Sequence, residues 1–184
     1  MLFRSQALYF KECGFNLHDT MIYIKDQLAF PETNRYYQAF EYMFVFSKGK
    51  PKTVNLISDK INKSFGRNVD KTGCRNIDGT LQKTKSGVGN AIKQKGVRWN
   101  YWLYYNQQRG FKHPAVFPEK LAEDHIISWS NDGDTILDPF SGSGTTAKMA
   151  KKNRRNYVGI EMSQKYCDIA NERLRVLDLQ PKLF

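Results

Sequence analysis

The sequence TILDPFSGSGTTAKMAKKNRRNYVGIE, residues 135–161, decides the fold of this chain. Its first residues form a short apolar strand that ends in Asp138. Gly142 and Gly144 then allow the backbone to turn closely before a helix begins. A second apolar strand, YVGI, ends in Glu161. Strand, glycine turn, helix and strand in this order predict a βαβ unit of a Rossmann-type parallel sheet, with ligands beyond the carboxyl ends of the strands.

Three cofactor classes compete for this glycine turn. A phosphate-binding P-loop needs Lys and then Ser or Thr after its last glycine, but Thr145 follows Gly144 here, which excludes that class. A dinucleotide site fits the spacing of Gly142, Gly144 and Glu161, but Asp138 at the strand end would repel a pyrophosphate. S-adenosylmethionine has no phosphate and carries two cationic groups, so the same carboxylate favours it.

The rest of the chain is consistent with one α/β fold. Pro118 is expected to begin a helix that extends to about Ser130, with Leu121, Ala122, Ile126 and Trp129 on its inner face. Ser163 can cap a last helix. In the first third we expect a helix over Gln6–Cys13 that stops at Gly14, and two strands of one sheet, Thr20–Ile24 and Tyr42–Phe46. The second strand is apolar enough to be buried on both faces.

Several segments together resemble a known family. HPAVFPEKL at 113–121, followed by DPFSGSGTT at 138–146, is similar to the DNA amino-methyltransferases. The order resembles their beta class, in which the catalytic half and the target recognition region precede the cofactor half. QALYFKECGFNLHDTMIYIK at 6–25 and RYYQAFEYMFVFSKGKPK at 35–52 are similar to the middle of the catalytic half of those enzymes. The resemblance implies methyl transfer from S-adenosylmethionine to the exocyclic amine of adenine or cytosine in DNA, as in restriction-modification.

The resemblance also implies a set of cofactor-binding residues. Asp138 matches the family carboxylate near the methionine end of the cofactor, and Glu161 is placed for the ribose hydroxyls. In HPAVFPEKL many relatives have Lys where this chain has Phe117, so no charge contact is expected there. The full set is Phe117, Pro118, Asp138, Phe140, Gly142, Gly144, Thr145 and Glu161.

One family element is missing from the sequence. The family carries a catalytic (Asp/Asn/Ser)-Pro-Pro-(aromatic) loop, near the amino end in the beta class, and no Pro-Pro dipeptide occurs in these 184 residues. That loop orients the target amine and stacks on the flipped base. We therefore expect an amino-terminally truncated or split methyltransferase without catalytic residues of its own, and a separately encoded amino-terminal piece as a possible partner. The alternative is an inactive remnant that binds DNA and cofactor.

The net charge of +11 is concentrated in one segment. Residues 60–112 contain twelve Lys and Arg against two Asp and Glu, whereas residues 1–59 carry a net +1 and residues 113–184 a net charge of zero. Together with the resemblance, this implies three parts of one globular domain: part of the catalytic half (1–59), a basic target-recognition insert (60–112) and the cofactor half (113–184). Double-stranded DNA is the expected partner, contacted by Lys83, Lys85, Lys93, Lys95 and Arg98. Trp99, Tyr101 and Trp102 are expected to anchor the insert to the core.

Other classes of protein are excluded or disfavoured by composition. The three cysteines and three histidines show no metal-ligand spacing, so neither zinc nor a disulfide framework is expected. No signal peptide and no run of membrane-spanning length occurs. These features predict a cytoplasmic protein of a bacterial or phage-infected cell.

Overall fold

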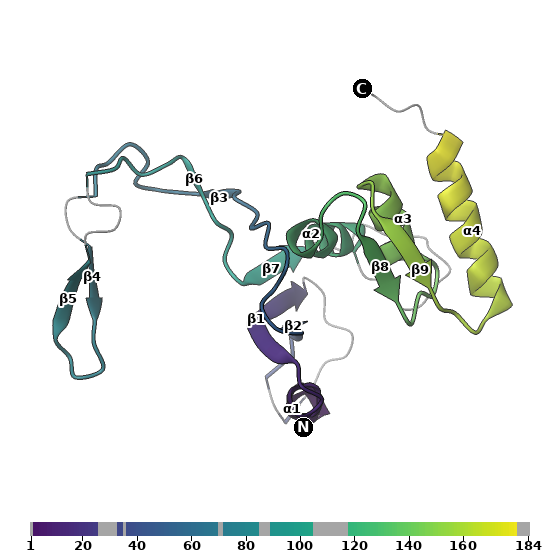
Figure 1. Ribbon diagram of the computed structural model, residues 1–184, viewed down its shortest axis with the longest axis horizontal. Coiled ribbons are helices and arrows are strands. Elements are labelled where there is room, and N and C mark those ends of the chain that lie inside the picture. Colours follow the sequence, from purple (N-terminus) through teal and green to yellow (C-terminus); the bar gives the residue numbers. More distant parts are fainter. Residues whose placement is uncertain are drawn as a thin grey trace. The chain divides into compact units, whose positions relative to one another are not determined.

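The computed structural model describes residues 2–25, 33–34, 36–69, 72–84, 89–104 and 118–179, excepting the side chains of 2–4, 72–75 and 81–84. The chain divides into two compact units (Figure 1). The first is formed by Met1–Asn55 together with Asn100–Phe184, and the second by Leu56–Trp99.

A three-stranded sheet forms one part of the first unit. Its strands are β1 (Asn16–Lys25), β2 (Phe40–Ser47) and β7 (Tyr101–Tyr104), in the order β2-β1-β7. β1 pairs antiparallel with β2 and parallel with β7. Helix α1 (Leu2–Glu12) precedes β1, and Gly14 follows it with φ +87°. The predicted first helix and the predicted pairing of the two strands in one sheet are confirmed.

The prediction that β2 is buried on both faces is wrong. Met43 and Val45 point toward the core cluster of Met21, Tyr23, Trp102 and Leu121. The alternate residues carry aromatic rings that contact one another along the strand, and Tyr42 remains 44% exposed. One face packs on the core, and the ladder of rings covers part of the other face.

A βαβ unit forms the other part of the first unit, as predicted. β8 (Thr135–Asp138) and β9 (Asn156–Gly159) pair in parallel, and α3 (Thr145–Lys152) connects them. Helix α4 (Gln164–Leu179) follows β9, and Ser163 directly precedes it, as expected of a cap residue. Among the described residues β8 and β9 form a two-stranded sheet.

Helix α2 (Glu119–Trp129) contributes to both hydrophobic clusters. Leu121 belongs to the cluster beneath the three-stranded sheet, whereas Ala122 and Ile126 pack with Met149 and Ala150 of α3. The predicted inner face of the helix is therefore correct, although it is shared between two cores. Pro118 lies at the N-cap rather than inside the first turn, with φ −59° and ψ 132°.

The second unit contains short paired strands. β3 (Lys60–Ile61) pairs with β6 (Lys95–Gly96), and β4 (Thr72–Arg75) pairs with β5 (Leu81–Thr84), both antiparallel. The turn between β4 and β5 is closed by Asn76, whose N–H donates to the carbonyl oxygen of Thr80 at 2.8 Å. Gly79 adopts φ +84° in this turn, a conformation that glycine adopts without steric cost.

The described part of the chain shows neither a membrane-spanning helix nor a metal-binding cluster. Within the ranges given above, no helix combines the length and apolarity needed to cross a membrane. Those ranges also contain no group of three or more His, Cys, Asp and Glu side chains able to hold a metal ion.

Candidate functional site

The glycine turn begins where β8 ends. The carboxylate of Asp138 accepts a hydrogen bond from the backbone N–H of Phe140 at 3.0 Å, which bends the chain immediately after the strand. The N–H of Ser141 donates to the carbonyl oxygen of Ile160 at 2.9 Å and joins the turn to the end of β9. Gly142 and Gly144 have φ +50° and +77°, so both use the left-handed conformation expected of glycine.

Glu161 braces this turn from the second strand. One carboxylate oxygen accepts the backbone N–H of Gly142 at 2.9 Å, and the other accepts the backbone N–H of Ser163 at 2.8 Å. The sequence placed Glu161 at the end of β9 but gave no sign of these two bonds. Asp138, Gly142 and Glu161 therefore lie together at the carboxyl ends of β8 and β9.

Two glycines bring backbone segments unusually close. A Cβ atom at Gly144 would lie 2.7 Å from the Cβ of Ala170 on α4, and one at Gly159 would lie 2.7 Å from the Oγ of Ser141. Both distances are shorter than side chains tolerate. Gly144 is therefore needed for helix packing as well as for its backbone angle, a role that the third glycine of dinucleotide-binding loops also fills.

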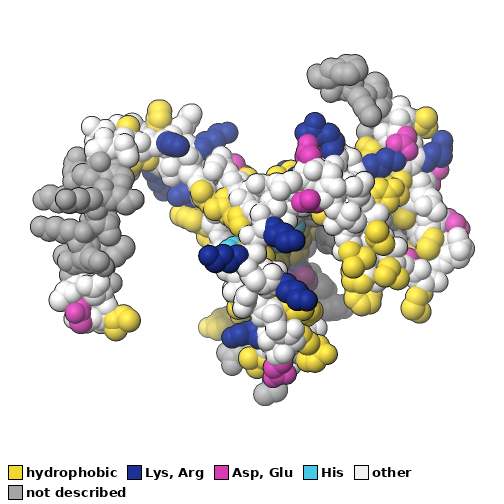
Figure 2. Space-filling view, in the orientation of Figure 1, with side chains coloured by type: hydrophobic (Ala, Val, Ile, Leu, Met, Phe, Trp, Pro, Cys, Tyr) yellow, Lys and Arg dark blue, Asp and Glu magenta, His cyan; other side chains and the backbone are white. Residues whose placement is uncertain are grey.

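Apolar side chains surround the open face of the turn. Phe140 is 89% exposed and Met162, next to Glu161, is 99% exposed. Further exposed apolar residues are Leu137 on β8, Val158 on β9 and Ile160 directly after β9. Figure 2 shows hydrophobic side chains gathered over β8 and β9. Carboxylates flanked by exposed apolar groups suit a ligand with a cationic part and a flat apolar part.

The remaining predicted cofactor residues lie at the back of the turn or outside the described ranges. Thr145 is 4% exposed, and its hydroxyl accepts a hydrogen bond from Arg173 at 3.2 Å. Pro118 is buried directly before α2. Phe117 lies outside the described residues.

A charged cluster joins the start of α2 to α3 and α4, and sequence reasoning missed it. Glu119 accepts hydrogen bonds from Lys148 and Arg173, both at 2.8 Å. Partial burial on its own would raise the pKa of Glu119, but the hydrogen bonds and charges of these two cations outweigh it and hold the pKa below its usual value. Lys148 and Arg173 are far from Glu119 in sequence and fit no motif, so the fold had to be known to find them.

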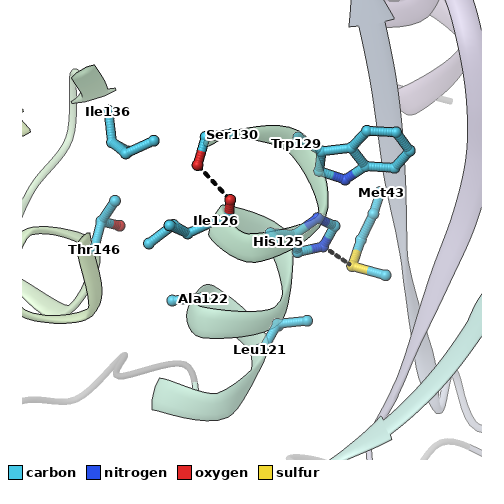
Figure 3. A pocket seen from close by; sticks show the side chains of 9 residues that line it. All are labelled: Met43, Leu121, Ala122, His125, Ile126, Trp129, Ser130, Ile136 and Thr146. Carbon is cyan, nitrogen blue, oxygen red and sulfur yellow. Dashed lines mark hydrogen bonds between the residues drawn. The ribbon is translucent and has the colours of Figure 1, made fainter. Parts of the chain in front are cut away.

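A separate apolar cavity of about 450 Å³ lies over α2 (Figure 3). Met43 lines it from β2, Ile136 from β8 and Thr146 from α3. His125 of α2 also lines it, with Nε2 3.0 Å from the sulfur of Met43, and burial lowers the pKa of His125 to about 4. The lining includes neither Asp138 nor Glu161, so this cavity is distinct from the site at the glycine turn.

The predicted DNA-contacting residues belong to the second unit. Lys93 and Lys95 are exposed. Arg98 forms an ion pair with Asp59, and its Nε donates to that carboxylate at 3.0 Å. Lys83 lies on β5, without a described side chain, and Lys85 lies outside the described residues. Nearby, the ammonium group of Lys60 lies 5.0 Å from the ring centre of Trp99.

The aromatic residues expected to anchor the insert behave differently from one another. Trp102 is 5% exposed and belongs to the core of the first unit. Trp99 and Tyr101 are 55% and 43% exposed, so only Trp102 of the three is buried as expected of an anchoring residue.

The fold and the site define an α/β protein of Rossmann type with a carboxylate-flanked glycine turn. A family model described as DNA methylase matches residues 2–172. The chain therefore belongs to the DNA methylase family, the amino-methyltransferases of DNA, as its sequence motifs predicted.

Individual relatives agree with this assignment. The chain is 59% identical over 178 residues to the orphan methyltransferase M.BamHII of Bacillus amyloliquefaciens, a match that covers 92% of this chain and 66% of the relative. It is 42% identical over 98 residues to the type II methyltransferase M.HinfI of Haemophilus influenzae, covering 50% of this chain and 27% of that protein. The chain thus spans less than two thirds of the length of these relatives.

Solved structures share the fold. The M1.HpyAVI-SAM complex matches with a TM-score of 0.61 and 27% identity, over 91% of this chain and 67% of that chain. The cytosine-N4-specific PvuII DNA methyltransferase matches with a TM-score of 0.63 and 20% identity, over 99% of this chain and 57% of that chain. The predicted Rossmann-like methyltransferase fold is confirmed.

Proposed function

We propose that this chain is a DNA amino-methyltransferase, or the cofactor- and DNA-binding part of one, that uses S-adenosylmethionine to methylate the exocyclic amine of adenine or cytosine. The observation that carries the proposal is the meeting of Asp138, Gly142 and Glu161 at the carboxyl ends of β8 and β9. Membership of the DNA methylase family indicates that methyl transfer is the reaction this site would serve. DNA and cofactor are both available in the cytoplasm of a bacterial or phage-infected cell, where we place the chain.

The geometry of the turn suits S-adenosylmethionine better than a dinucleotide. The N–H of Gly142, which would be available to a pyrophosphate in a dinucleotide site, already donates to the carboxylate of Glu161. A pyrophosphate would also face the negative charges of Glu161 and Asp138, whereas a sulfonium and an ammonium would be attracted by them. A related structure was solved as a complex with this cofactor, M1.HpyAVI with SAM.

Each residue of the site has a role that follows from its position. Asp138 attracts the cationic end of the cofactor, and the exposed ring of Phe140 provides a flat apolar wall. Each carboxylate oxygen of Glu161 has acceptor capacity left after its bond to the backbone, so it can receive ribose hydroxyls while it braces the turn. The bound cofactor supplies an electrophilic methyl group.

The target amine must be oriented by groups that this sequence does not contain. Transfer requires the lone pair of the amine to point at the methyl group, and a flipped base needs acceptors and a stacking ring to hold it. No Pro-Pro-aromatic loop occurs in the 184 residues. We infer that a separately encoded amino-terminal piece supplies that loop; the alternative is an inactive protein that binds DNA and cofactor.

The exposed surface of the small parallel sheet supports such a partner. Leu137, Val158 and Ile160 are 61%, 49% and 54% exposed, and β8 pairs with β9 alone among the described strands. An open strand edge beside apolar residues is suited to pairing with a further strand.

The second unit is the proposed DNA-binding surface. Lys63, Arg67, Lys93 and Lys95 are exposed on it. These cations can neutralise phosphates, which favours DNA binding without specifying a sequence. Arg98 is engaged with Asp59 in the structure, so a phosphate would have to compete with that carboxylate.

Titration calorimetry with S-adenosylhomocysteine tests the cofactor assignment. We expect binding by the wild-type chain and a loss of roughly tenfold or more in affinity in Asp138→Ala, because the attraction of the carboxylate for the ligand ammonium disappears. Asp168→Ala is the matched control, since Asp168 is exposed on α4 and accepts a hydrogen bond from Gln164. Preferential binding of NAD, or equal effects of the two substitutions, would overturn the assignment.

A further inference from the structure

Arg173 occupies the back of the glycine turn. This side chain of α4 is 12% exposed and makes four hydrogen bonds to two neighbouring segments. Nη1 donates to the carbonyl oxygen of Ser143 at 2.6 Å, to its hydroxyl at 3.0 Å and to the hydroxyl of Thr145 at 3.2 Å. Nη2 donates to the carboxylate of Glu119 at 2.8 Å. One guanidinium group thus joins the turn, the first residue of α3 and the first residue of α2.

The electrostatic setting of Arg173 is unusual. A cation near the start of a helix is opposed by the positive end of the helix dipole, and Arg173 contacts the first residues of both α2 and α3. Glu119 compensates for this unfavourable position because it is a carboxylate at a helix start, where the dipole favours it. A guanidinium group suits this position because its planar fork bonds several acceptors at once. The ammonium group of a Lys lacks that fork and could not reach all of them together.

The same face of α4 supports the turn along its whole rear side. Ala170, three residues before Arg173, fills the space that a side chain at Gly144 would need. Ser143 and Thr145 are 8% and 4% exposed, in contrast to the 89% exposure of Phe140 on the open side. The rear of the turn is therefore packed against α4, while Phe140 on the other side is exposed.

We propose that Arg173 is a positioning residue for the cofactor site: it fixes Ser143 and Thr145 relative to Glu119, and so holds the glycine turn and the start of α2 in one geometry. Arg173 touches the turn from behind and acts on the ligand through it. The inference rests on the proposed cofactor function but assigns a residue that neither motif contains. Its removal would allow the turn to move, and small displacements of binding groups cost affinity steeply.

The test compares Arg173→Met with Arg175→Met, a control on the same helix whose guanidinium pairs with Glu172 at the surface. Two quantities are measured well below the unfolding temperature: hydrogen exchange of the amides of residues 141–145, and the Kd for S-adenosylhomocysteine. We expect Arg173→Met to accelerate exchange in the turn and to raise the Kd, each by roughly tenfold or more, while Arg175→Met stays within about twofold. Arg173→Lys, which can still reach Glu119, should lie between them.

Three outcomes separate the possibilities. Exchange and Kd within about twofold of wild type in Arg173→Met would overturn the proposal. Faster exchange spread equally over α2, α3 and α4 would also overturn it, because it would mean that Arg173 is a general stabiliser. If the wild-type chain binds no S-adenosylhomocysteine, the proposed function fails, while exchange in the turn still decides the role of Arg173. Should Arg173→Met not fold, both measurements on Arg173→Lys replace it: an intermediate rise in exchange and Kd supports the proposal, and values within about twofold of wild type overturn it.

Discussion

At the scale of single residues, the site carboxylates make backbone hydrogen bonds, whereas the half-buried imidazole of His125 lies in an apolar setting. Glu161 and Asp138 accept backbone hydrogen bonds at the ends of two strands. His125 lies between Met43 and the ring of Trp102, whose centre is 4.6 Å from its own. Burial in that apolar setting lowers the pKa of His125 to about 4, although the charge of Asp124 acts in the opposite direction.

The stability of the chain should therefore fall between pH 7 and pH 5. The pKa of His125 is lower in the folded state than the ordinary value of 6.5, so the unfolded chain binds the proton first as pH decreases. The contribution of neutral His125 to the free energy of unfolding is fully present above pH 6.5. It is lost progressively as the pH falls toward 4. We expect a loss of about 2 kcal/mol between pH 7 and pH 5, measured by urea unfolding at the two values.

His125→Phe should remove most of that pH dependence. His18→Gln is the control, because His18 is exposed and lies edge-on to Trp129. A pH profile that His18→Gln flattens as much as His125→Phe does would refute the assignment to His125.

At the scale of secondary-structure elements, glycine geometry connects α3 to α4. Gly144→Ala should lower the free energy of unfolding by about 2–4 kcal/mol, because the new methyl group would meet Ala170 and the residue must keep a positive φ. Gly133→Ala is the matched control, with φ +85° and open space around it, and should cost about 1–2 kcal/mol. Urea unfolding of both variants measures the difference, and equal losses would show that the contact with Ala170 contributes nothing.

The basic residues of the second unit should bind duplex DNA in a salt-dependent way. Neutralising Lys83, Lys85, Lys93 and Lys95 together should reduce the slope of log affinity against log salt by about 3–4, since each phosphate contact contributes about 0.9. Fluorescence anisotropy at several salt concentrations measures the slope. Neutralising Lys11 and Lys165, which are exposed in the first unit, should leave it unchanged. Binding that ignores salt, or an unaltered slope in the fourfold variant, would contradict this prediction.

The elements that could be predicted from sequence are those whose signals are local. Periodic apolar residues gave the inner face of α2, and the order of strand, glycine and helix gave the βαβ unit. The burial of β2 could not be predicted from its sequence. An apolar strand has the same residue pattern whether its aromatic side chains pack into a core or against one another on the strand. The contacts of Arg173 and Glu119, 54 residues apart, could not be predicted either, since charge pairs between distant elements leave no periodic signal.

At the scale of the whole molecule, the chain should bind cofactor and DNA without transferring a methyl group. Family membership indicates the reaction class. Without hydrogen-bond acceptors for its amine, however, the target base would not be oriented for methyl transfer. A tritium-transfer assay on unmethylated DNA should give no turnover with the chain alone. Addition of the part of M.BamHII that lies outside its match to this chain should restore turnover. Turnover by the chain alone that disappears in Asp138→Ala would mean that a catalytic group exists within these residues.

Helix α2 couples the unfolding of the two hydrophobic clusters in the first unit. Its Leu121 belongs to one hydrophobic cluster and its Ala122 and Ile126 to the other, so neither cluster can open without exposing part of the same helix. Loss of either cluster would leave a half-solvated helix of 11 residues, which is too short to persist by itself in water. The two cores should therefore melt in one cooperative transition, with calorimetric and van't Hoff enthalpies that agree.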